Sequence, residues 1–267
     1  MSKVVLEDQG PVAVLRLANG VTNAIGSELV EELLEAIGSV QNRYRGLVLA
    51  GNTKFFSIGL DVPHLLMLDR SAMHGFWNRF EDLVLALYTL PIPTASAICG
   101  HATGGGAILA LACDFRLVAD GKRLIALNEV KIGLPVPYLA DLMLRQVVTD
   151  RVAVEMEFCS AFIGPNDAKT VGLVDAVCDE KAVEENALGK IREMAALPPT
   201  AFALTKQHRI RQIPPRFIAV RQELNRSFID CWFAPATQVL LKEAAQKFYR
   251  GGNARPVSAF FTSRPAF

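Results

Sequence analysis

Two glycine-bearing turns hold the residues of this 267-residue chain that are best suited to chemistry. The first is KFFSIGLD at residues 54–61, and the second is GHATGGGAIL at residues 100–109. Consecutive glycines at the start of a helix let a ligand approach the backbone, where the first N–H groups have no helical partner. The helix dipole adds partial positive charge at the same place. The second turn therefore suits an anion, either a phosphate group or an oxyanion.

Phosphate-binding motifs match the second turn poorly. The chain has no GxxxxGK[ST] segment, and GHATGGG does not fit the GxGxxG pattern of dinucleotide-binding folds. A GxSxG nucleophile elbow is also missing. No set of His, Cys or carboxylate residues has the spacing of metal ligands, so we expect no metal site. Taken alone, the glycines leave an oxyanion site and simple close packing as alternatives.

Three segments in order resemble the crotonase (enoyl-CoA hydratase/isomerase) superfamily over nearly the whole chain. FFSIGLD at 55–61 matches its first motif, with Ile58 where a small residue is usual, and residues 100–114 match its second. LNEVKIGLP at 127–135 matches the third and puts Glu129 at the family's catalytic position. In these motifs the chain is most similar to the Δ3–Δ2-enoyl-CoA isomerases. One such match is weak, but three at the right separations make the resemblance specific.

This resemblance implies an acyl-coenzyme A thioester as substrate, with coenzyme A as part of it and no prosthetic group. It implies an oxyanion hole made by the backbone N–H groups of Leu60 and Gly105, which hold the thioester oxygen as negative charge develops. Lys54 is placed for the phosphates, and Lys247 would reach the ribose phosphate. The residues expected at the coenzyme A end are Lys54, Ser57, Gly59, Asp61, Gly104 and Lys247.

The acid–base residues decide which reaction of the family the chain performs. By resemblance, hydratases use two carboxylates, and the first of these positions is Ile108 here, whereas Glu129 fills the second. The further Asp of dienoyl-CoA isomerases corresponds to Pro137. A single carboxylate can take a proton from one carbon and return it two carbons away. We therefore expect conversion of 3-enoyl-CoA to trans-2-enoyl-CoA, with enoyl-CoA hydratase as the alternative. An acyl-CoA hydrolase or decarboxylase, or a non-catalytic acyl-CoA-binding homologue, also stays open.

An apolar pocket is expected around Glu129 for the acyl chain, with Leu60 among the residues that line it. Such surroundings raise the pKa of a carboxyl group and make it a stronger base. For each lining residue, ordinary core packing is the competing interpretation. The expected lining residues are Leu65, Leu66, Phe76, Trp77, Ile108, Leu134 and Pro135.

Alternating strand and helix signals must position these residues. Short apolar strands are predicted near 12–15, 46–50, 94–99 and 115–118, and helices at 27–37, with Ser27 as N-cap, 74–90 and 107–113. This order indicates a parallel sheet with crossover helices. Beyond residue 138 the pattern is mainly helical.

The fold class expected is therefore α/β, a crotonase-like spiral of βαβ units at residues 1–198 followed by a helical region at 199–267. By resemblance, this C-terminal region packs against neighbouring subunits in a homotrimer or a dimer of trimers. Its apolar residues fit that role: Phe228, Ile229, Trp232, Phe233, Val239 and Leu240.

The amino-acid composition limits the binding partners and the cellular compartment that we expect for the chain. Lysine plus arginine total 28 against 27 for aspartate plus glutamate, so no overall charge favours nucleic acid or an acidic membrane. The longest apolar run, 83–99, is interrupted by Pro91 and Pro93, so we expect no membrane span. Five cysteines without a CxxC pair, and an N-terminus without a signal-peptide core, indicate reduced thiols in a cytoplasmic protein.

Overall fold

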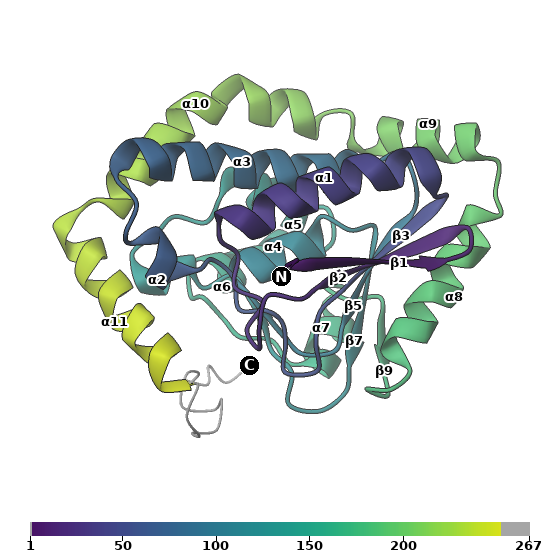
Figure 1. Ribbon diagram of the computed structural model, residues 1–267, viewed down its shortest axis with the longest axis horizontal. Coiled ribbons are helices and arrows are strands. Elements are labelled where there is room, and N and C mark those ends of the chain that lie inside the picture. The colour runs from purple at the N-terminus through teal and green to yellow at the C-terminus, as the bar shows by residue number, and fades with distance from the viewer. Residues whose placement is uncertain (1, 252–267) are drawn as a thin grey trace.

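The computed structural model describes residues 2–251, and side chains as far as residue 246. Its main feature is a six-stranded sheet in the order β1-β2-β3-β5-β7-β9 (Figure 1). β1 pairs antiparallel with β2, and every other neighbouring pair in this sheet is parallel. The strands are β1 (Val4–Gln9), β2 (Val12–Leu17), β3 (Gly46–Ala50), β5 (Thr94–Ile98), β7 (Phe115–Ala119) and β9 (Ala176–Cys178).

A second, three-stranded parallel sheet has the order β4-β6-β8. β4 (Phe55–Ser57), β6 (His101–Thr103) and β8 (Ile125–Ala126) each follow a strand of the main sheet along the chain. The chain therefore passes repeatedly from the large sheet to the small one, which confirms the predicted spiral of βαβ units. Strands of two or three residues are too short to show a period-two pattern, so the sequence did not reveal this sheet.

Helices cover both faces of the large sheet. α1 (Ser27–Arg43) and α3 (Arg70–Thr89) lie over one face, and α8 (Val183–Ala195) lies over the other (Figure 1). Successive strand residues point to opposite faces. Leu47 and Leu49 therefore join the larger core with α1 and α3, whereas Val48 packs in the smaller core beneath α8.

The ends of two helices differ from the sequence-based prediction. α3 begins at Arg70 because the Asp69 side chain caps it, accepting a hydrogen bond from the Ala72 N–H at 2.8 Å. The prediction of Ser27 as an N-cap is wrong. Gly26 occupies the cap position, since Ile25 is still held extended by its bridge to Leu60.

Short helices lie between β4 and β9 along the chain, and the first three of them each follow a strand of the small sheet. They are α2 (Val62–Leu65), α4 (Gly105–Leu111), the 3₁₀ helix η1 (Glu129–Ile132), α5 (Tyr138–Leu144), α6 (Asp150–Glu157) and α7 (Pro165–Thr170).

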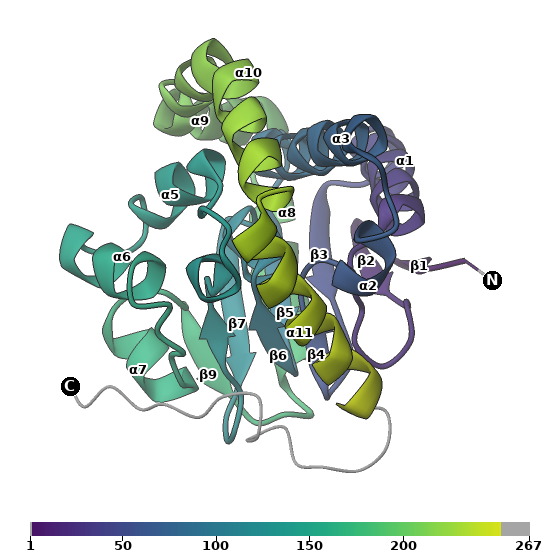
Figure 2. The ribbon, with the colours of Figure 1, turned by 90° about the vertical axis from the view of Figure 1, so that its left-hand side faces the viewer.

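Three helices complete the described chain, as predicted: α9 (Pro199–Ile210), α10 (Ile213–Trp232) and α11 (Pro235–Gly251). α10 lies along α3 (Figure 1), and α11 runs back past α2 (Figure 2) and also contacts η1. The predicted division into two domains falls where α9 starts and stays a prediction. Within residues 2–251, no helix has both the length and the apolar composition to cross a membrane.

Candidate active site

The two glycine-bearing turns meet at one edge of the small sheet. β4 and β6 are parallel neighbours, so the turns that follow them leave the sheet side by side. Gly59 has a φ of +100°, which favours glycine, and a Cβ added there would lie 2.7 Å from the Thr103 carbonyl oxygen. The same Cβ would lie 3.1 Å from the Gly105 nitrogen. The first turn therefore contacts the start of α4 directly.

Gly106 makes a second close contact between these turns. A Cβ added to Gly106 would lie only 2.3 Å from the Ser57 carbonyl oxygen. In addition, the Thr103 hydroxyl donates a 2.8 Å hydrogen bond to the Ile58 carbonyl. The spacing of the two turns is thus fixed by backbone contact and by one side-chain hydrogen bond.

Two backbone N–H groups at this junction have no acceptor within residues 2–251. Ile25 bonds to the Gly59 carbonyl and the Asp61 N–H, so the Leu60 N–H between them points away from Ile25. Gly105 is the first residue of α4, and its N–H is one of the donors that a helix cannot satisfy internally. These are the two donors that the resemblance implied for an oxyanion hole.

Glu129 lies against the same glycine turn. It follows β8, which pairs with β6, and its Oε1 would be 3.6 Å from a Cβ added to Gly104. The side chain is 7% exposed, and Oε2 has no hydrogen-bond partner among the described residues. The pKa of Glu129 is raised to about 7, mainly by burial; a hydrogen bond from the Glu129 backbone N–H opposes the rise, and the charge of Glu157 adds to it. Near neutral pH this carboxyl can both accept and release a proton.

Most of the predicted apolar lining is buried. Ile108, on the first turns of α4, is 2% exposed, and Leu134, just after η1, is also 2% exposed. Leu65 and Phe76 are buried, Leu66 is half-buried, and Pro135 is exposed.

Trp77 packs between α3 and α10. Its ring stacks on Phe228 with centroids 3.6 Å apart, and its indole N–H donates to the Asn225 Oδ1 at 3.2 Å. These contacts account for its burial, and its role in an acyl pocket stays a prediction.

The residues predicted at the coenzyme A end fall into two groups. Lys54 is exposed beside the first turn, where a phosphate could reach it. Ser57 and Asp61 instead shape the turn: the Ser57 hydroxyl donates to the Asn23 carbonyl at 2.7 Å, and Asp61 caps α2 through the His64 N–H. Lys247 belongs to α11, and its side chain lies outside the described ones.

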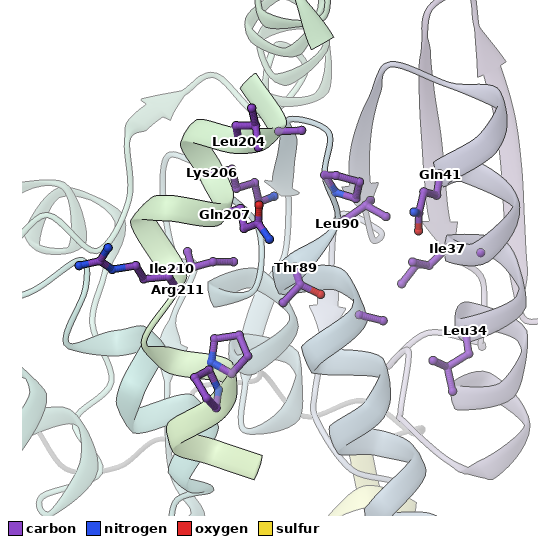
Figure 3. A pocket seen from close by; sticks show the side chains of 16 residues that line it. Leu34, Ile37, Gln41, Thr89, Leu90, Leu204, Lys206, Gln207, Ile210 and Arg211 are labelled. Carbon is purple, nitrogen blue, oxygen red and sulfur yellow. The ribbon is translucent and has the colours of Figure 1, made fainter. Parts of the chain in front are cut away.

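A separate hollow of about 780 Å³ opens between α1, the end of α3 and α9 (Figure 3). Leu34, Ile37, Leu90 and Ile210 contribute to its walls, and none of the predicted site residues lines it. Within residues 2–251, no group of three or more His, Cys, Asp or Glu side chains is arranged to hold a metal ion.

Glu157 is a buried carboxyl that the sequence analysis did not single out. It ends α6, is 5% exposed, and acts electrostatically on Glu129 from 28 residues further along the chain. Its sequence neighbourhood, VEMEF, looks like an ordinary amphipathic helix. Only the fold, which joins η1 to the segment after α6 through Lys131 and the Ser160 carbonyl, reveals the relation.

Residues 7–234 match the sequence pattern of the enoyl-CoA hydratase/isomerase family. The chain belongs to this family. The assignment confirms the resemblance drawn from the three motifs, and it makes the protein an enzyme of the enoyl-CoA class.

Proteins similar to this chain include some named isomerases and some named hydratases. It is 32% identical over 225 residues to human mitochondrial enoyl-CoA delta isomerase 1, which covers 82% of this chain and 74% of the human protein. It is 32% identical over 206 residues to a putative enoyl-CoA hydratase of Thermus thermophilus, which covers 75% of this chain and 81% of that protein. The crystal structure of human mitochondrial delta3-delta2-enoyl-CoA isomerase superposes with a TM-score of 0.89 at 28% identity, covering 94% and 99% of the two chains. The fold class is thereby confirmed.

Proposed function

We propose that the chain is a Δ3–Δ2-enoyl-CoA isomerase in which Glu129 is the acid–base residue. The observation that supports this proposal is a single buried carboxyl against the glycine turn, with apolar Ile108 at the position where hydratases carry their other carboxylate. One carboxyl suffices to move one proton between two carbons. The pKa of Glu129 near 7 suits both halves of that transfer.

In this mechanism the thioester oxygen accepts hydrogen bonds from the Leu60 and Gly105 N–H groups. The Glu129 carboxylate removes a proton from C2, and the electron pair of the C2–H bond delocalises into the carbonyl and the C3–C4 double bond. The carboxylic acid then returns the proton to C4, which leaves the double bond between C2 and C3. Loss of one donor from an oxyanion hole typically costs about 2.7–4 kcal/mol of transition-state stabilisation.

The buried apolar side chains near Glu129 support a fatty acyl tail over a charged one. Lys54 would contact the coenzyme A phosphates, and Lys247 the ribose phosphate. Coenzyme A enters as part of the substrate, with no prosthetic group.

Enoyl-CoA hydratase is the second candidate, because the chain is 32% identical to the putative Thermus hydratase as well as to the human isomerase. Hydration would require Glu129 and backbone groups to hold the water without a second carboxylate. An ultraviolet assay that follows 3-enoyl-CoA and 2-enoyl-CoA in parallel separates the two reactions. Faster isomerisation of 3-enoyl-CoA supports the proposal, and faster hydration of crotonyl-CoA replaces it.

We also propose that the protein is cytoplasmic and assembles as a homotrimer or a dimer of trimers. Three apolar residues that suggested assembly from sequence, Phe228, Ile229 and Trp232, are buried within the subunit. Other apolar side chains on the late helices support the proposal, because they are exposed on the single chain. These are Leu204, Ile218, Leu224, Val239 and Leu240.

A further inference from the structure

The Glu129 carboxyl is held by its own backbone rather than by neighbouring side chains. Its Oε2 has no hydrogen-bond partner within residues 2–251, although the side chain is only 7% exposed. The carboxyl accepts a hydrogen bond from the Glu129 backbone N–H. The direction in which it points therefore depends on the backbone of η1, the 3₁₀ helix that begins with Glu129.

Gly133 ends η1 and is hydrogen-bonded back to Glu129. The Gly133 N–H donates to the Glu129 carbonyl and shares this bond with the Val130 carbonyl. The next N–H, that of Leu134, donates to the same Glu129 carbonyl at 3.0 Å. A movement of the Gly133 peptide is therefore transmitted to the Glu129 backbone through main-chain hydrogen bonds.

Two side chains from the last described helices hold the Gly133 carbonyl. The Thr237 hydroxyl donates to this oxygen at 3.2 Å, and the Cys231 thiol donates to it at 3.0 Å. Thr237 is 5% exposed and lies in the first turn of α11, whereas Cys231 lies in the last turn of α10. A Cβ added to Gly133 would lie 3.0 Å from the Thr237 Oγ1 and 3.2 Å from the Leu240 Cδ1. The first turns of α11 thus pack directly on the end of η1.

The corner between α10 and α11 is fixed by hydrogen bonds of its own. The Gln238 side-chain amide donates to the Trp232 carbonyl at 2.7 Å, and the Ala234 N–H donates to the Cys231 carbonyl at 3.2 Å. The Trp232 side chain is fully buried. The hydroxyl and the thiol are therefore presented to η1 from a corner that is itself well held.

We propose that Thr237 is a positioning residue for Glu129 and that, together with Cys231, it sets the direction of the catalytic carboxyl by holding the Gly133 carbonyl. This role rests on the proposed isomerase function. Neither side chain takes part in the proton transfer, because both act through the backbone of η1. Misplacing a reacting group by about 1 Å can lower a rate by about 10²-fold, so a small shift of η1 is enough to matter.

Holding the carboxyl through the backbone has an advantage for a base. A side chain that positioned Glu129 by donating hydrogen bonds to its carboxylate would stabilise the charged form and lower the pKa. Donors that act on the Gly133 carbonyl fix the position of Glu129 without this effect. They also leave the Glu129 Oε2 without a protein partner, so it can meet the substrate proton.

The experiment measures kcat and KM for isomerisation of 3-enoyl-CoA by the full chain and by variants at the two donors. Thr237→Val keeps the shape and removes the hydroxyl, so we expect kcat to fall by about tenfold while KM changes by less than about twofold. Thr237→Ser keeps a hydroxyl and should restore kcat to within about twofold of the native value. In the same way, Cys231→Ala should lower kcat, whereas Cys231→Ser should not.

Thr205→Val is the matched control, because the exposed Thr205 hydroxyl donates to the Ala201 carbonyl of its own helix, α9, at 2.8 Å. It should leave kcat and KM unchanged. Native kcat in both Thr237→Val and Cys231→Ala, with circular dichroism showing folded proteins, overturns the positioning role alone. A loss of kcat that Thr237→Ser does not restore overturns it as well, because the hydroxyl is then not the cause.

If Thr237→Val does not fold, the comparison of Cys231→Ala with Cys231→Ser decides. A lower kcat in Cys231→Ala alone supports the positioning role, and equal kcat in the two variants overturns it. A native enzyme that does not isomerise 3-enoyl-CoA overturns the proposed function, and the positioning role with it.

Discussion

The environment of Glu129 is dominated by burial rather than by ion pairing. Burial is the largest cause that shifts its pKa; the Glu129 backbone N–H lowers the pKa, the charge of Glu157 raises it, and no cation among the described side chains contributes. A carboxylate without a counter-ion is costly to bury but strong as a base. A change at Glu129 should therefore affect both the rate of isomerisation and the free energy of unfolding.

Replacing Glu129 with Gln should lower kcat for 3-enoyl-CoA isomerisation by about 10²–10⁴-fold, because the amide keeps the shape and removes the base. Binding of a coenzyme A ester, measured by calorimetry, should stay nearly unchanged. Glu185→Gln, an exposed change on α8, serves as the control for the substitution itself. If the Glu129 variant retains most of the isomerase rate, the proposed mechanism is wrong although the family assignment stands.

The same substitution should stabilise the protein at alkaline pH. The pKa of Glu129 rises from 4.5 to about 7 in the folded state, so folding favours the protonated form. The stabilisation that protonated Glu129 gives the folded state is fully present below about pH 4.5 and is lost as the pH rises through about 7. Glu129→Gln should therefore raise the free energy of unfolding by about 3 kcal/mol near pH 8 and by little near pH 4.5. Urea unfolding at both pH values measures it, and an equal effect at the two would contradict the assignment of a buried, proton-binding Glu129.

At the scale of elements, the turns are positioned by strands that the sequence hardly shows. All three motifs are contiguous, so the positions of Leu60, Gly105 and Glu129 along the chain could be predicted from sequence. The strands β4, β6 and β8, which bring them together, are only two or three residues long and carry no periodic signal. Glu157 could not be predicted, because its relation to Glu129 depends on how α6 docks.

Replacing Gly106 with Ala tests this positioning. The added methyl would lie 2.3 Å from the Ser57 carbonyl oxygen, so one of the two turns must move. We expect a loss of about 1–3 kcal/mol in unfolding free energy and a larger loss of activity than of stability. Gly38→Ala is the control, because Gly38 lies in α1 with no atom within 4 Å of the added Cβ. That variant should be neutral or more stable by up to about 1 kcal/mol. Native activity in Gly106→Ala would contradict the close fit of the turns.

In the molecule as a whole, the last helices close over the elements that bear the site. α11 contacts both α2 and η1, and the Thr237 hydroxyl donates to the Gly133 carbonyl at 3.2 Å, four residues after Glu129. The position of Gly133 is thus held from the far end of the chain. The sequence predicted these helices but not that several of their aromatic residues fill the subunit's own core.

The whole molecule is expected to assemble through its exposed apolar residues. Light scattering at micromolar concentration should give the mass of a trimer or a hexamer, because exposed Leu204, Ile218 and Val239 would otherwise face water. Ile218→Lys should weaken the assembly, whereas Arg226→Lys, on an exposed part of the same helix, should not. A native monomer would remove the assembly proposal.

The close contact between the two turns limits which substitutions this chain can accept during evolution. Gly59 meets the Thr103 carbonyl and Gly106 meets the Ser57 carbonyl, so each contact has main chain on both sides. A side-chain change elsewhere cannot compensate for a larger residue at either glycine. Substitutions are therefore expected at neighbouring residues such as Ile58 and Leu60, whose side chains are only partly buried. Changes there can leave the backbone spacing of the two turns as it is.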